Sequence, residues 1–63
     1  MKYNIGDLFI ATKTIGLMIE NDNNVYIIEW MENKRIWTKT YTEFQIDNFI
    51  NFHKSMKHYP VKE

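Results

Sequence analysis

Apolar residues along the chain follow two different spacings. From residue 7 to residue 41, short runs rich in Ile, Val and aromatic residues alternate with polar turn-forming residues, which is typical of β-strands joined by tight turns. From residue 42 the apolar spacing becomes that of a helix, and a short strand-like segment follows it. The pattern therefore predicts four strands, one helix and a last strand.

Turn-forming residues set the boundaries of the first two predicted strands. A Gly-Asp pair opens the first strand, over residues 7–13, and Gly16 precedes the second, over residues 17–20. The polar run NDNN at residues 21–24 is the clearest turn, because Asn and Asp tolerate left-handed backbone and hydrogen-bond within their own turns.

Residues 25–41 predict a hairpin with a polar ENK turn at residues 32–34. In its first strand, VYIIEW, both alternating faces are largely apolar, and this suits a strand inside a sheet. One face of that strand carries three large apolar side chains: Tyr26, Ile28 and Trp30. In the second strand, RIWTKTY, side chains alternate, so that one face carries Trp37, Lys39 and Tyr41.

A helix is predicted over residues 43–53. It begins with a capping box, in which Thr42 and Gln45 each satisfy a free backbone N–H of the other residue. Its core face is predicted to hold four residues: Ile46, Phe49, Ile50 and His53. Phe44 and Phe52 point off this stripe. We expect them to pack on the closing strand, and exposure to a partner is the alternative.

The last predicted strand covers residues 55–61. Pro60 lacks a backbone N–H, which puts it on an edge or at the end of this strand. The order strand, strand, strand, strand, helix, strand predicts a mainly β domain, a small five-stranded SH3-like barrel with one helix.

Four segments resemble the small SH3-like barrels carried by tailed bacteriophages: IGDLF, IGLMIE, VYIIEW and YTEFQIDNFI. The resemblance spans residues 3–61 and implies a fold much more than an activity, because most such phage chains have no known function. The first two strands are also similar to KOW-type barrels, but Thr14 and Ile15 do not supply the basic residue of that pattern. Frequent Ile, Asn and Lys, which have A/T-rich codons, agree with a phage source.

The 63 residues are predicted to form one domain, residues 1–63. A chain of this length buries only about 60% of its unfolded surface, so its core needs support. It has no Cys and is 16% aromatic, which leaves a dense aromatic core or a partner chain. No run approaches the roughly 20 apolar residues of a membrane span, and the first residues do not form a signal peptide. We therefore expect a cytoplasmic protein with no membrane partner, in the host cytoplasm if it is phage-encoded.

The residue types argue against catalysis. There is no Cys nucleophile, the two His residues lack the spacing of a zinc motif, and two Gly residues cannot build a phosphate-binding loop. We expect no enzymatic activity, no catalytic residue, no metal and no cofactor.

The candidate binding surface is the end of the ENK turn together with the predicted strand that follows it. It combines three cations with two aromatic residues: Lys34, Arg35, Trp37, Lys39 and Tyr41. Aromatic rings that stack on bases and cations that hold phosphates are the ingredients of single-strand nucleic-acid binding. A net charge of zero speaks against a polyanion partner, and Trp37 and Tyr41 are also suited to the core.

Protein contact is the favoured function, through an aromatic groove, an open strand edge or self-association. The aromatic residues that are candidates for an exposed patch are Trp30, Trp37, Tyr41 and Tyr59. Residues 1–33 carry a net charge of −3 and residues 34–63 carry +3. If the cations cluster on one face with exposed aromatic rings, nucleic acid is favoured, and if they scatter, a protein partner is favoured. The cations in question are Lys34, Arg35, Lys39, Lys54 and Lys57.

Overall fold

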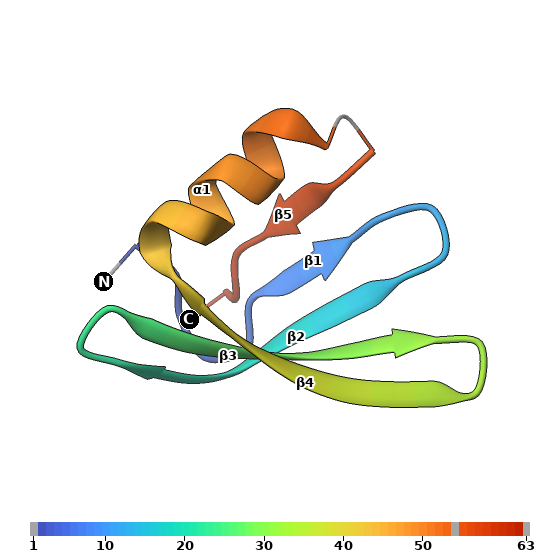
Figure 1. The fold of residues 1–63 in the computed structure, drawn as a ribbon, viewed down its shortest axis with the longest axis horizontal. Helices are drawn as coiled ribbons and strands as arrows, with labels where there is room; N and C mark the ends of the chain where they lie inside the picture. Colours follow the sequence, from blue (N-terminus) through green and yellow to red (C-terminus); the bar gives the residue numbers. More distant parts are fainter. Residues whose placement is uncertain (1, 54, 63) are drawn as a thin grey trace.

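The computed structural model describes residues 2–53 and 55–62, which form five antiparallel strands in one sheet and one helix (Figure 1). The elements are β1 (Leu8–Ile10), β2 (Ile15–Asp22), β3 (Val25–Glu32), β4 (Arg35–Thr42), α1 (Glu43–Phe52) and β5 (Lys57–Tyr59). This confirms a mainly β fold and the predicted order of elements. Among the residues that the structure describes, no helix is long and apolar enough to cross a membrane.

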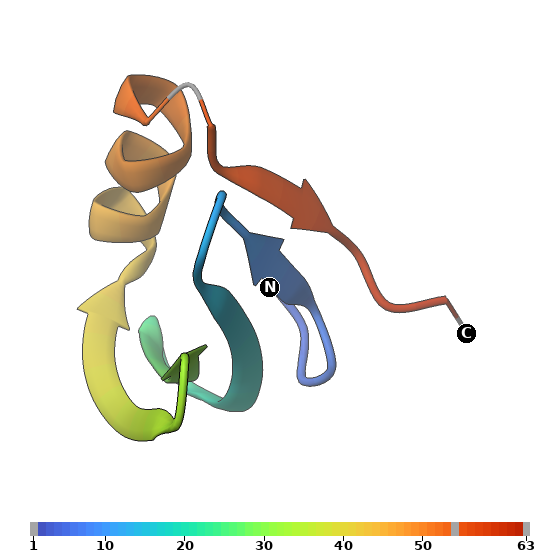
Figure 2. The same ribbon diagram turned by 90° about the vertical axis from the view of Figure 1, so that its right-hand side faces the viewer.

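The strands lie in the order β4-β3-β2-β1-β5, so β4 and β5 form the two edges of the sheet. Figure 2 shows the sheet curling around its core, with α1 lying across the open side. Within residues 2–53 and 55–62, β4 and β5 do not pair with each other. The closure of the sheet into a barrel therefore stays a prediction.

Asn residues shape the two hairpins that join β2, β3 and β4. Asn23 and Asn24 have positive φ angles of 45° and 67°, and Asn33 has a φ of 56°. Asn and Asp adopt this left-handed backbone more readily than other residues with a side chain. The turn predicted at residues 21–24 is thus correct in place but shorter, because β2 extends to Asp22. Strand β2 also begins earlier than predicted, since Ile15 pairs with Met31 of β3.

The predicted capping box is present at the start of α1. The backbone N–H of Gln45 donates to Thr42 Oγ1 at 3.2 Å, and the backbone N–H of Thr42 donates to Gln45 Oε1 at 2.9 Å. The predicted core stripe is confirmed for Ile46, which is buried, and for Phe49 and Ile50, which pack against the core. His53 lies just beyond the helix and is exposed.

Phe44 and Phe52 are 71% and 79% exposed, so the expectation that they pack on the closing strand is wrong. The reason is helical geometry. At about 100° per residue, Phe44 lies roughly 200° around the helix from Ile46, on the side away from the sheet. Strand β5 pairs with β1 at the far edge of the sheet and does not extend around α1 to cover that side.

The core lies between the concave face of the sheet and α1. Its buried side chains are Tyr3, Phe9, Met18, Tyr26, Ile28, Trp30, Tyr41, Ile46 and Met56. The alternation predicted for β3 is confirmed, because Tyr26, Ile28 and Trp30 are its buried face. A row of paired positions across four strands, Phe9–Gly16–Trp30–Trp37, defines the core face up to the β4 edge.

A buried carboxylate connects the start of the chain to its last strand. Asp7 accepts hydrogen bonds from the backbone N–H groups of Asn4 (3.1 Å) and Val61 (2.9 Å), and its Oδ2 lies 2.7 Å from His58 Nε2. Burial alone would raise the pKa of Asp7, but the hydrogen bonds from Val61, His58 and Asn4 outweigh it and lower the pKa. This contact holds β5 and the segment after it against the sheet.

Candidate functional site

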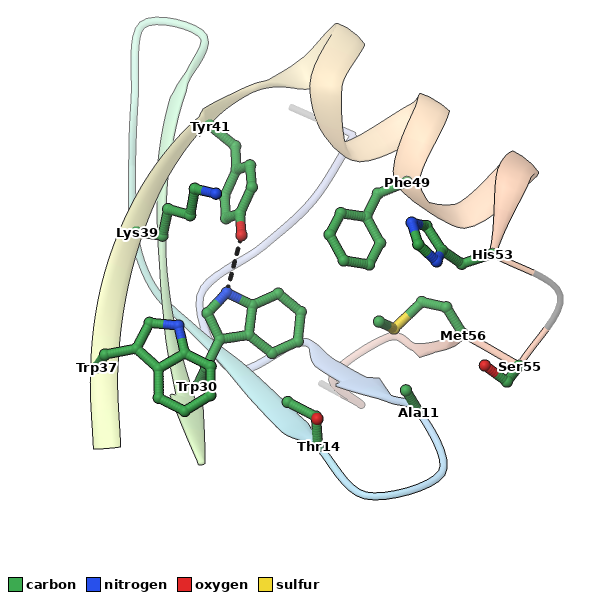
Figure 3. A pocket seen from close by; sticks show the side chains of 10 residues that line it. All are labelled: Ala11, Thr14, Trp30, Trp37, Lys39, Tyr41, Phe49, His53, Ser55 and Met56. Atoms are coloured by element: carbon green, nitrogen blue, oxygen red, sulfur yellow. Dashed lines mark hydrogen bonds between the residues drawn. The ribbon is translucent and has the colours of Figure 1, made fainter. Parts of the chain in front are cut away.

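A hollow of about 320 Å³ opens between β4 and the chain that leads into β5 (Figure 3). We call it the aromatic pocket. Ten residues line it: Ala11, Thr14, Trp30, Trp37, Lys39, Tyr41, Phe49, His53, Ser55 and Met56. It lies at the β4 edge of the core face, where the sheet is open. Its volume is at the lower end of the range for ligand sites and suits one or two side chains of a partner.

Buried aromatic side chains hold one wall of the pocket in a fixed orientation. The indole N–H of Trp30 donates to the Tyr41 hydroxyl at 2.9 Å, and the two residues are 4% and 8% exposed. Phe49 stacks on Trp30 with a centroid distance of 5.7 Å and meets Tyr41 edge-on at 6.3 Å. Burial raises the pKa of Tyr41, while the bond from Trp30 acts in the opposite direction. The hydroxyl therefore stays neutral at physiological pH.

Gly16 makes room for the Trp30 ring. A Cβ at this position would lie 2.6 Å from Trp30 Cζ3 and 2.9 Å from Ile28 Cγ2, closer than carbon atoms can approach. Gly16 pairs directly with Trp30 across the β2–β3 ladder. Gly16 is thus a residue of β2 that lets the indole ring of Trp30 pack directly against the strand backbone.

Trp37 forms the mouth of the pocket and remains 39% exposed. It pairs with Trp30 across the β3–β4 ladder, so both rings lie on the core face of the sheet. The predicted shared face of β4 is confirmed, since Trp37, Lys39 and Tyr41 all line the pocket. Tyr41 belongs to the core, whereas Trp37 is where the core face reaches the surface.

Lys39 brings a positive charge to this mouth. Its Nζ lies 5.8 Å from the centre of the Tyr41 ring, within the range of a cation–π interaction. No Asp or Glu is among the lining residues that the structure describes. The pocket therefore combines apolar walls with a cationic rim.

The opposite wall comes from three separate segments. His53 follows α1 and stacks on Phe49 with centroids 4.5 Å apart. Thr14 lies in the loop before β2, and its hydroxyl donates to Glu32 Oε1 at 2.7 Å. Met56 precedes β5 and is buried. No sequence pattern pointed to Thr14 or Met56 as pocket residues, because they meet β4 only through the curl of the sheet.

The remaining predicted site residues are not part of the pocket. Lys34 and Arg35 are exposed at the β3–β4 turn, and Arg35 shares the face of Trp37 and Lys39 by strand alternation. Lys57 pairs with Ile10 and lies on the other face of the sheet, since its neighbour His58 pairs with buried Phe9. Lys54 lies outside the described residues.

The aromatic residues predicted as an exposed patch do not form one. Trp30 and Tyr41 are buried, and Trp37 is at the pocket mouth. Tyr59 is 48% exposed but pairs with Leu8, and this puts it on the other face of the sheet. Tyr59 and Trp37 therefore cannot belong to a single patch, because side chains on the two faces of a sheet point in opposite directions.

A second hollow, of about 390 Å³, lies between α1 and the start of the chain. Its lining residues are Lys2, Tyr3, Asp47, Ile50, Asn51 and His58. The polar groups here satisfy one another: the Tyr3 hydroxyl donates to Asp47, and Lys2 Nζ lies 2.9 Å from the same carboxylate. The Tyr3 hydrogen bond and then Lys2 lower the pKa of Asp47. We interpret this cluster as a structural contact that attaches the first residues to α1.

Across residues 2–53 and 55–62, no group of three or more His, Cys, Asp or Glu side chains is placed to hold a metal ion. Comparison of the chain with protein-family models, with curated proteins and with solved structures found no match. The assignment of function therefore rests on the geometry of the aromatic pocket.

Proposed function

We propose that the protein is a small, non-enzymatic binding module that holds an apolar side chain of a protein partner in the aromatic pocket. The observation that carries this proposal is the placement of half-exposed Trp37 beside the buried Trp30–Tyr41 pair, on the same face of the sheet. Aromatic residues that are fixed before binding lose little conformational entropy when a partner docks, and this favours recognition.

We further propose that the chain folds as an SH3-like barrel of the kind found in tailed bacteriophages. The support is the antiparallel meander of β1 to β4, the helix between β4 and β5, and the pairing of β5 with β1. The sheet curls around a single core, as such a fold requires. A phage source and a site of action in the host cytoplasm are parts of this same proposal.

The pocket is tested by titration with N-acetyl-phenylalaninamide, followed by the indole N–H signals of the two Trp residues in ¹H–¹⁵N NMR spectra. We expect saturable shifts of both indole signals, since both rings line the pocket. Trp37→Ala should abolish the shift of the remaining Trp30 signal, and Lys39→Gln should leave both shifts in place. The matched control is Phe52→Ala, which deletes an exposed aromatic ring away from the pocket. Shifts that are equal in size and spread over the whole surface would refute the pocket as the site.

Single-stranded nucleic acid is the second candidate partner. It is favoured by the placement of Lys39 beside Trp37 and Tyr41, because bases stack on aromatic rings while cations hold the phosphates. Lys57 on the opposite face and a net charge of zero argue against it. If this candidate is right, the affinity for oligo(dT) falls steeply as the salt concentration rises, and Lys39→Glu lowers it further. Absence of oligo(dT) binding at low salt would rule out nucleic acid as the partner.

A further inference from the structure

Strand β4 presents an open edge beside the aromatic pocket. It is paired with β3 along all eight of its residues, and no strand of the described residues lies on its other side. Its sequence, RIWTKTYT, contains no Pro, and its register with β3 has no bulge. A long, regular, unpaired edge of this kind is a template for another strand.

The turn geometry shows which backbone groups of β4 are free. A two-residue turn joins Glu32 and Arg35, so this closing pair is hydrogen-bonded across the ladder. Because bonded and non-bonded pairs alternate, the odd-numbered residues from 35 to 41 bond to β3. The backbone N–H and C=O groups of Ile36, Thr38 and Thr40 therefore point away from the sheet.

The side chains beside this edge define what a strand placed there would carry. Arg35, Trp37 and Lys39 follow one another on the core face of β4 and are all exposed. A strand alongside would place three alternating side chains opposite them. Charge complementarity calls for an acid opposite each cation, and the apolar pocket calls for an apolar or aromatic side chain between the acids.

A second copy of this chain does not supply that pattern. Of its eight acidic residues, only Glu43 and Asp47 are four positions apart, and Gln45 stands between them. Both acids also belong to α1 and are therefore not in an extended segment. The acidic segment has to come from a different protein.

We propose that β4 binds an extended segment of a partner protein by antiparallel strand addition, and that the segment reads acid–x–apolar–x–acid. The middle side chain enters the aromatic pocket, and the two acids lie against Arg35 and Lys39. The antiparallel direction follows the rest of the sheet, in which every pair is antiparallel. This inference rests on the proposed function, since it uses the same pocket.

The probe is a heptapeptide with blocked ends and the sequence Thr-Asp-Val-Phe-Val-Glu-Thr. In the proposed register, its Phe faces Trp37, and its two Val residues face Ile36 and Thr38 and bond to them. We expect N-methylation of either Val to weaken binding at least about tenfold, because a backbone donor is lost and the methyl group blocks the approach. N-methylation of the Phe should change the affinity by less than about threefold. The Phe N–H points away from β4, so the methyl group removes only a hydrogen bond to water.

The same peptide tests the contribution of its Asp and Glu side chains and the contribution of the free edge of β4. Replacing its Asp and Glu by Asn and Gln should weaken binding about two- to fivefold for each acid, as exposed ion pairs do, and the effect should shrink at high salt. Hydrogen exchange should slow at the Ile36 and Thr38 amides, which bond to the two Val residues, when the peptide binds. The Trp37 amide is already bonded to β3 and should exchange as before.

The outcomes separate this inference from the proposed function. If the N-methylated Val peptides bind as well as the parent while Trp37→Ala still abolishes binding, strand addition is wrong and the pocket remains the site. If Trp37→Ala changes neither peptide nor phenylalaninamide binding, both proposals fail. A dimer of the free protein with slow exchange at Ile36 and Thr38 would assign the edge to a second copy and overturn the inference.

Discussion

The indole N–H of Trp30 donates a hydrogen bond of 2.9 Å to the hydroxyl of Tyr41, and both side chains are buried. The two residues come from neighbouring strands and meet at the base of the aromatic pocket. This bond fixes the orientation of the indole that pairs with Trp37 at the pocket mouth. The pocket therefore depends on the same contact that completes the core.

Tyr41→Phe is expected to lower the free energy of unfolding by about 1–3 kcal/mol, because it leaves the buried Trp30 N–H without an acceptor. Urea unfolding followed by Trp fluorescence measures the loss. Tyr59→Phe is the matched control, since Tyr59 is half-exposed on the other face of the sheet, and it should change stability by less than about 0.5 kcal/mol. Equal stability of the two variants would contradict the role given to this hydrogen bond.

Gly16→Ala is expected to destabilise the protein by about 1–3 kcal/mol, because the added methyl group meets the Trp30 ring and Ile28. The double variant with Trp30→Phe checks the cause. If the clash involves the indole, the double variant should lose less stability than the sum of the losses of the two single variants. The reason is that the smaller Phe ring leaves space for the methyl group. Additive losses would place the strain of Gly16→Ala elsewhere.

The sequence predicted best those features that arise from local chemistry. The capping box of Thr42 and Gln45, the buried face of β3 and the shared face of Trp37 and Lys39 each depend on spacings within a few residues. Alternation along a strand tells which side chains share a face, but it does not tell how far the face extends before it reaches solvent. Thus it could not separate buried Tyr41 from half-exposed Trp37.

Features that depend on the curl of the sheet were beyond sequence reasoning. Asp7 and His58 are 51 residues apart and meet because β5 pairs with β1, and no sequence pattern indicated that these two residues are in contact. Met56 reaches the aromatic pocket for the same reason. The exposure of Phe44 and Phe52 was mispredicted because the sequence does not show where β5 lies relative to α1. The connection after α1 leads β5 to the edge of the sheet opposite β4.

The Asp7 carboxylate is expected to make stability depend on pH. Its pKa is lower in the folded protein than in the unfolded chain, so the unfolded state binds more protons in the range between the two values. The stabilisation is therefore complete above the ordinary Asp pKa, near pH 4, and is lost as the pH falls below it. Urea unfolding between pH 2.5 and pH 6 (approximate limits set by that pKa) measures this slope.

Asp7→Asn should flatten that slope and lower stability at neutral pH by about 2 kcal/mol, because the amide cannot serve the Val61 N–H and His58 as a charged acceptor does. Asp22→Asn is the control, since Asp22 is exposed at the end of β2. If Asp7→Asn and Asp22→Asn show the same pH dependence as the unmodified chain, the buried carboxylate is not the source of acid sensitivity.

The most direct test of the aromatic pocket is a quantitative comparison of the proteins that three immobilised forms of the chain retain from a lysate of the cells that express it. The comparison is made with and without nuclease treatment of the lysate. The three forms are the unmodified chain, Trp37→Ala and Phe52→Ala. We predict a partner that the unmodified chain and Phe52→Ala retain equally, and that Trp37→Ala retains at least about tenfold less, as for a central aromatic contact. Equal retention by Trp37→Ala, or loss of all retained protein after nuclease treatment, would contradict the account.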